Sequence, residues 1–209
     1  MSLLRRWLIK KLKPEVYQRF HWELERDMPV KEACFVVFDT ETTGLDLKKD
    51  EPVSIGALKI RGLKIHLSES FYQLLKPQRT LKESIKVHGI TLEDLQVAKE
   101  GRQVCEEFIS YAWGCVLVGY FVHIDVSMLR NLTKKACGGA FYPYAVDVLD
   151  LIKPLNNIPT LEELLKEHRL PVSKAHNALE DAYMTALLFL KLVKEGRYKR
   201  LMDLPVRVY

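Results

Sequence analysis

The chain has 209 residues and a formal net charge of +5, with 48% hydrophobic and 28% charged residues. These proportions are those of a globular protein with a real core, and they exclude disordered and fibrous chains. No stretch reaches the roughly 18 consecutive apolar residues of a membrane span. The apolar run near the basic N-terminus is also too short for a secretory signal. We therefore expect a cytoplasmic protein without membrane contact.

The cysteines and the charge add weaker constraints. Cys34, Cys105, Cys115 and Cys137 form no C-x-x-C pair and no Cys/His spacing that suits zinc. We expect all four to be reduced, mostly buried small apolar side chains. The net charge and a pI near 8.9 favour an anionic partner without demanding one.

Residues 1–30 form the first predicted unit. Apolar residues recur every fourth position from Leu4 to Phe20, with basic residues between them, which is an amphipathic helical pattern. Pro14 interrupts the pattern and suits the first turn of a second helix. We interpret this segment as a helical extension packed on the domain. A basic surface for nucleic acid or a partner protein is the alternative.

Strands and helices follow one another through the rest of the chain. Strands are expected at 33–40, twice within 52–77 around a turn at Arg61–Gly62, and at 115–120. Helices are expected at about 98–113, 123–136, 160–168 and 178–194. The strand at 33–40 is apolar on both faces, which indicates a central position in a sheet. This pattern predicts an α/β fold.

Asp39 and Glu41 lie two residues apart at the end of the apolar strand. Strand side chains alternate, so the two carboxylates project from one inward face, with Cβ atoms roughly 7 Å apart. Ligands of open α/β sheets gather at the carboxyl ends of strands. Buried like charges need a shared proton, a basic partner or a cation. We favour a cation, because Lys48 and Lys49 belong to a solvated turn.

Two further acids and a histidine extend the predicted site. Asp125 falls in the first turn of a helix, where an acid is ordinary. Asp181 lies one turn inside the last helix, on its inward stripe, where an uncompensated charge costs several kcal/mol. Four carboxylates without matching basic residues predict a site for magnesium or manganese. His176, in the loop before that helix, suits a general base, although a surface histidine fits the position equally well.

Three segments carry a family resemblance. FDTETTGLD (38–46), VGYFVHIDVSMLR (118–130) and HNALEDAYMT (176–185) resemble the three motifs of the DEDDh 3′–5′ exonucleases. The chain is most similar to the branch that includes the proofreading epsilon subunits of bacterial replicative polymerases, and KVHGIT (86–91) resembles that branch's connecting loop. The similarity spans about residues 33–195.

The resemblance implies a ribonuclease H-like fold with a mixed five-stranded sheet flanked by helices. It assigns residues 31–197 to the exonuclease domain and leaves 198–209 as a short C-terminal tail. It also implies a hydrolase that releases nucleotides from DNA 3′ ends, in proofreading or repair, with two divalent cations, Mg²⁺ or Mn²⁺. The implied metal ligands are Asp39, Glu41, Asp125 and Asp181, the implied general base is His176, and the implied substrate contacts are Thr42, Glu83 and His88.

One departure from the family and several alternatives remain. The family usually has His-Asn where this chain has Tyr120-Phe121, which leaves the acids intact and bears on substrate contacts. Single-stranded DNA 3′ ends are the expected substrate, with RNA as an alternative, and a DNA polymerase subunit is a candidate partner. The competing functions are an RNA-directed exoribonuclease of the same family and a non-catalytic, polymerase-associated nucleic-acid-binding module. A haloacid-type phosphatase is disfavoured, because it would require an aspartate at Glu41.

Overall fold

The computed structural model describes residues 7, 11, 15, 20–77, 89–152, 157–173 and 177–209. Within these residues the strands are β1 (Phe35–Thr42), β2 (Pro52–Arg61), β3 (Lys64–Leu74), β4 (Val116–Gly119), β5 (Tyr144–Asp147) and β6 (Arg207–Val208). The helices are α4 (Gly101–Ala112), α5 (Val122–Cys137), α6 (Leu161–Glu167) and α7 (Ala178–Gly196). Three 3₁₀ turns accompany them: η1 (Asp94–Val97), η2 (Val148–Leu151) and η3 (Leu201–Asp203).

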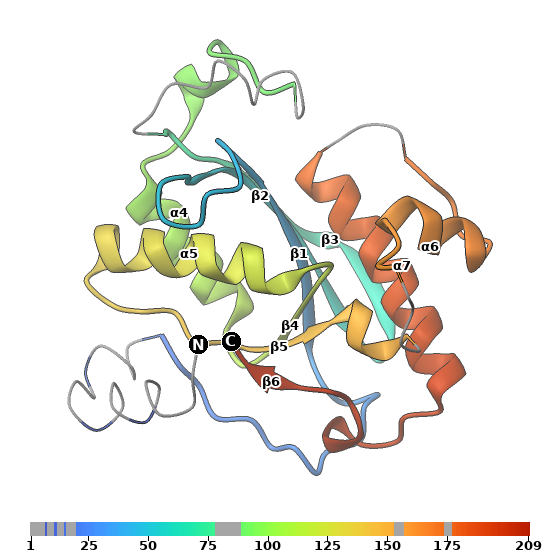
Figure 1. The fold of residues 1–209 in the computed structure, drawn as a ribbon. Helices are drawn as coiled ribbons and strands as arrows, with labels where there is room; N and C mark the ends of the chain where they lie inside the picture. Colours follow the sequence, from blue (N-terminus) through green and yellow to red (C-terminus); the bar gives the residue numbers. More distant parts are fainter. Residues whose placement is uncertain are drawn as a thin grey trace.

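The strands form one mixed sheet in the order β3-β2-β1-β4-β5-β6 (Figure 1). β1 is central, because it pairs antiparallel with β2 and parallel with β4. The predicted α/β class is confirmed, but the expected count of five strands is wrong. The sixth strand arises because Arg207 and Val208, near the end of the expected tail, pair antiparallel with β5. A two-residue strand is too short to leave a periodic signal in the sequence.

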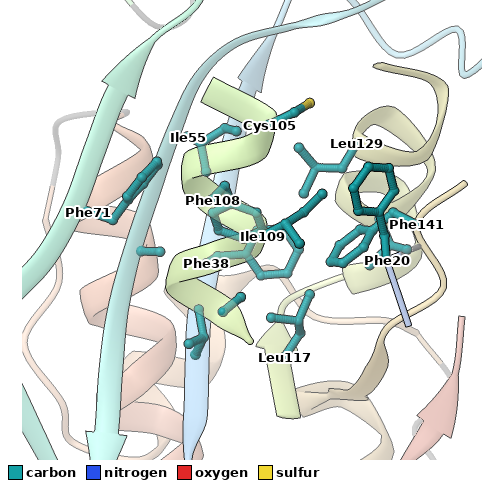
Figure 2. Close-up of a cluster of buried hydrophobic side chains, with 14 of the residues drawn as sticks. Phe20, Phe38, Ile55, Phe71, Cys105, Phe108, Ile109, Leu117, Leu129 and Phe141 are labelled. Carbon is teal, nitrogen blue, oxygen red and sulfur yellow. The ribbon is translucent and has the colours of Figure 1, made fainter. Parts of the chain in front are cut away.

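Helices cover both faces of the sheet, with α4 and α5 on one side and α6 and α7 on the other (Figure 1). The alternation of β1 divides the core between these layers: Val36 and Phe38 belong to the α4–α5 side, whereas Phe35 and Val37 pack on the α7 side. Figure 2 shows the first half, where the Phe38 and Phe108 rings lie 5.4 Å apart. Each face of β1 therefore points toward a different helical layer.

The segments near the two chain ends contact each other. The Val30 amide donates to the Lys199 carbonyl, and the Leu201 amide donates to the Met28 carbonyl, both at 2.9 Å. Residues 20–30 lie in turns and extended chain, so the helical pattern does not continue through them. Most of the remaining expected extension lies outside the described residues.

The cysteine prediction is wrong for one pair. Cys34 and Cys115 form a disulfide across 81 residues of sequence, with their Cα atoms 4.6 Å apart, while Cys105 and Cys137 are buried thiols that are not part of a disulfide. The cause is the pairing of β1 with β4: Cys34 directly precedes β1, Cys115 directly precedes β4, and the Val116 amide donates to the Cys34 carbonyl. Sequence spacing alone carries no sign of this pairing.

The 19-residue helix α7 lies directly on the sheet at Gly56 of β2. A Cβ atom at Gly56 would lie 2.2 Å from the Leu179 nitrogen and 2.3 Å from the Ala178 carbonyl carbon, both of them backbone atoms. Gly56 is the register partner of Asp39 in β1. The missing side chain therefore lets the first turn of α7 reach the end of the central strand. Across the described part of the chain, no helix has both the length and the apolar character to cross a membrane.

The close approach at Gly56 predicts a large cost for a single methyl group. Gly56→Ala should lower the free energy of unfolding by about 3 kcal/mol, the upper end for overpacking, because backbone cannot rotate away as a side chain can. Urea unfolding measures the change. The matched control is Gly101→Ala: the atoms nearest to its Cβ belong to the flexible side chain of Leu132, so it should change stability by less than about 1 kcal/mol. Equal effects of the two substitutions would contradict this view of the helix–sheet contact.

Candidate metal centre

Three carboxylates gather where β1 ends. Asp39 and Glu41 project from the β1 face that packs on α7, and Asp181 lies in the first turn of that helix. The side chain of Asn177 caps the helix by accepting the Leu179 amide at 3.0 Å. One carboxylate oxygen from each of the three acids lies within 4.8 Å of the others. Strand alternation and the close approach at Gly56 thus bring together acids 140 residues apart in sequence.

Asp125 approaches the same strand from the other face. It lies in the first turn of α5 and is 5% exposed. Its Oδ1 atom accepts the Thr40 amide at 3.1 Å and the Thr40 hydroxyl at 2.6 Å. The β1–β4 ladder ends at the Val37–Val118 pair. Just beyond this pair, the Asp125 carboxylate accepts the backbone amide of Thr40 in β1. The fourth predicted ligand therefore adjoins the group of three without belonging to it.

The electrostatics of the site are dominated by buried negative charge. Burial raises the pKa of Asp39 well above its usual value, and the charges of Asp125, Glu41 and Asp181 raise it further. Burial also raises the pKa of Asp125 to about 7, against the opposing hydrogen bonds from Thr40. Among the residues that the structure describes, the charged side chains that shift the Asp39 pKa, Asp125, Glu41 and Asp181, are all carboxylates. A cation is the natural complement of such a group.

The donor set fits a hard divalent cation. Carboxylate oxygens are the ligands that magnesium and manganese prefer, and these ions are held by a few acids together with water or substrate oxygens. Asp39, Glu41 and Asp181 can each contribute one oxygen without rearrangement of their strand or helix. The described residues provide this one gathering of three or more potential ligands.

A cleft of about 350 Å³ opens beside the acids. Asp39 and Asp181 line it together with Tyr120, and further side chains come from α6, α7 and the segment before α7. The Tyr120 hydroxyl donates to the carbonyl of Pro159, which fixes the ring at the wall of the cleft. The remaining residues that line the cleft are Thr160, Leu161, Glu162, Leu165, Val172, Ser173 and Met184.

Of the four other predicted site residues, the structure describes Thr42 alone. Thr42 ends β1, and its hydroxyl donates to the Gly44 carbonyl at 2.8 Å, so it braces the loop that follows. His176, Glu83 and His88 lie outside the described residues.

Two acids next to the site were missed by the sequence analysis. Asp147 ends β5 and is 7% exposed, and its carboxylate accepts backbone amides of Phe121, Val122 and Leu149. Asp50 accepts the Thr43 hydroxyl and the Asp46 amide, which fixes the loop after β1. A signal for Asp147 existed: like Asp39, it directly follows an apolar run, here Tyr-Ala-Val.

Comparison with known proteins assigns the chain to a family. The exonuclease family model RNase_T matches residues 36–189, which contain all four predicted metal ligands. The chain therefore belongs to this exonuclease family.

Individual relatives agree with the assignment. The chain is 34% identical over 174 residues to a DNA polymerase III PolC-type protein of Thermotoga maritima, covering 82% of this chain and 13% of that protein. It is 30% identical over 172 residues to the DNA polymerase III subunit epsilon of Aquifex aeolicus, covering 80% of this chain and 84% of that subunit. The chain thus spans a small part of the PolC-type relatives and most of the epsilon relative.

Solved structures define the fold. Exonuclease I of E. coli, in complex with a dT13 oligonucleotide, superposes with a TM-score of 0.65 at 21% identity, covering 79% of this chain and 42% of that one. The ribonuclease H-like fold implied by the sequence motifs is confirmed, with a mixed six-stranded sheet.

The raised pKa of Asp125 predicts how stability without metal depends on pH. Its pKa rises from 3.8 to about 7 on folding, so the folded state binds this proton more tightly than the unfolded state does. Its contribution to the free energy of unfolding should therefore decrease as pH rises from about 4 to about 7. Asp125→Asn keeps an acceptor for Thr40 and should flatten this part of the pH profile. Urea unfolding in chelator between pH 4.5 and 7.5 tests it, and identical slopes for variant and wild type would contradict the burial argument.

Proposed function

We propose that the chain is a metal-dependent 3′–5′ exonuclease that releases nucleotides from DNA 3′ ends in proofreading or repair. In this proposal Asp39, Glu41, Asp125 and Asp181 hold two divalent cations, Mg²⁺ or Mn²⁺, and His176 is the general base. The observation that carries the proposal is the gathering of Asp39, Glu41 and Asp181 within 4.8 Å in a chain of the exonuclease family.

The proposed roles follow from charge and position. When bound, the cations would supply Lewis-acid activation of water and neutralise charge on the scissile phosphate. The carboxylates on β1 and α7 orient that site from two rigid elements. Asp125, held by Thr40, adds negative charge from the opposite face. His176 would accept the proton of the attacking water, which requires its neutral form and so favours activity above its reference pKa near 6.5.

DNA is the preferred substrate over RNA. The relatives at 34% and 30% identity are named as parts of DNA polymerase III, and the E. coli exonuclease I structure holds a DNA oligonucleotide. The cleft beside Asp39 and Asp181, with Tyr120 on its wall, is a suitable place for the terminal nucleotide. Thr42, Glu83 and His88 remain the proposed substrate contacts. An RNA-directed exoribonuclease of the same family is the second candidate.

The proposal also covers organisation and partners. We assign residues 31–197 to the exonuclease domain, 1–30 to an N-terminal extension and 198–209 to a C-terminal tail. The epsilon and PolC-type relatives support a DNA polymerase as partner and a cytoplasmic location. A non-catalytic module docked on a polymerase is less well supported, because such a module would not need three acids held together at one strand end.

Digestion of matched 5′-labelled DNA and RNA strands, with magnesium or with chelator, tests activity, polarity and sugar preference together. We expect shortening of DNA from its 3′ end only with the metal. Asp39→Ala and Asp181→Ala should each lower the rate by more than about 100-fold, which exceeds the usual cost of losing a residue that only orients a metal ligand. Single-strand binding should persist in both variants.

The control is Asp150→Ala. Asp150 pairs with Arg207 at 3.0 Å and does not belong to the group of three acids. The control variant should cleave at the wild-type rate. Metal-independent cleavage, or full activity of Asp181→Ala, would contradict the proposal. Faster digestion of RNA would select the exoribonuclease alternative.

A further inference from the structure

The buried carboxylate of Asp147 performs no role in the proposed metal set, yet it is fully engaged. Its Oδ1 atom accepts the Phe121 amide at 3.3 Å and the Leu149 amide at 3.1 Å, and its Oδ2 atom accepts the Val122 amide at 3.0 Å. The residue lies at the end of β5, next to the end of β4, where Gly119 is its register partner. One side chain thus connects the ends of two adjacent strands to the start of α5.

Asp147 replaces the cap that α5 lacks. The N-cap residue of this helix is Phe121, whose side chain has no hydrogen-bond acceptor, and the helix has no side-chain cap of its own. Phe121 also has φ 53° and ψ 42°, a left-handed conformation that bulky L-residues rarely adopt. Two of the three amides that Asp147 accepts belong to Phe121 and to Val122, the first helical residue. Its carboxylate therefore both caps the helix and holds the strained turn.

The segment held by Asp147 carries two groups of the candidate site. Tyr120, immediately before the strained residue, lines the cleft with Asp39 and Asp181. Asp125, in the first turn of α5, approaches β1 at Thr40. Tyr120 directly precedes Phe121, and Asp125 lies in the helical turn that follows it. A change of the backbone angles at Phe121 would therefore move both side chains.

We propose that Asp147 is a positioning residue for the metal centre, acting through the left-handed turn at Phe121 to fix Tyr120 at the cleft and Asp125 against β1. This inference rests on the proposed metal site and deepens it. The proposed role of Asp147 differs from that of a purely structural helix cap in one respect. Loss of the carboxylate should weaken cation binding even where the protein remains fully folded.

Mn²⁺ binding, followed by electron paramagnetic resonance, tests the inference with a readout that does not depend on cleavage. Asp147→Asn should raise the Mn²⁺ dissociation constant at least about 10-fold, as loss of a residue that orients a metal ligand typically does. The matched control is Asp203→Asn in η3, beyond the C-terminal end of α7. Asp203 also accepts two backbone amides, from Lys199 and Arg200, and the control should bind Mn²⁺ as the wild type does. Circular dichroism at the assay temperature verifies folding.

The outcomes separate this inference from the proposed function. Equal Mn²⁺ affinity of folded Asp147→Asn and Asp203→Asn would overturn the positioning role, whatever the nuclease assay gives. Wild-type protein that binds Mn²⁺ but cleaves no nucleic acid would overturn the proposed function alone. Failure of the wild type to bind Mn²⁺ would overturn both.

If Asp147→Asn does not fold, the comparison moves to a background that tolerates the left-handed turn. Phe121→Asn places there a residue that adopts this conformation more readily. Adding Asp147→Asn to it should still raise the Mn²⁺ dissociation constant, and no change between the single and the double variant would overturn the inference.

Discussion

Carboxylates repel one another at one end of the central strand, and the surrounding fold holds them together. Asp39, Glu41 and Asp181 lie close enough to share one small ion, and Asp125 adds its charge from the opposite face. Burial of such a group is unfavourable unless positive charge or protons compensate it. Burial raises the pKa of Asp39, and the charges of Asp125, Glu41 and Asp181 raise it further, so a cation at this site would compete with a proton for the Asp39 carboxylate.

The fold maintains this unfavourable arrangement with contacts that lie outside the acids themselves. Gly56 permits α7 to lie on β2, and that contact brings Asp181 to β1. Thr40, on the opposite face of the strand, donates hydrogen bonds from its amide and its hydroxyl to Asp125. Asp147 holds the turn before α5, and Asp50 holds the loop after β1. Each contact supports one approach to the end of β1, so the site is built by the sheet and both helical layers together.

The sequence predicted the parts of this arrangement that local patterns encode. The apolar run before Asp39, the alternation that puts Glu41 on the same face, and the inward stripe bearing Asp181 are properties of single elements, so periodicity detects them. It could not detect β6, a two-residue strand formed by tertiary pairing, or the Cys34–Cys115 disulfide, which depends on β1 lying beside β4. The side of β1 from which Asp125 approaches also required the helix layers to be known. His176 lies outside the described residues, so its role remains a sequence prediction.

If these acids hold divalent cations, anomalous scattering from crystals soaked in Mn²⁺ should locate the ion. We expect an anomalous peak bounded by the carboxylates of Asp39, Glu41 and Asp181, and no peak at that position in crystals of an Asp181→Asn variant. Crystals of wild-type protein at saturating Mn²⁺ with no peak between these side chains would contradict the account.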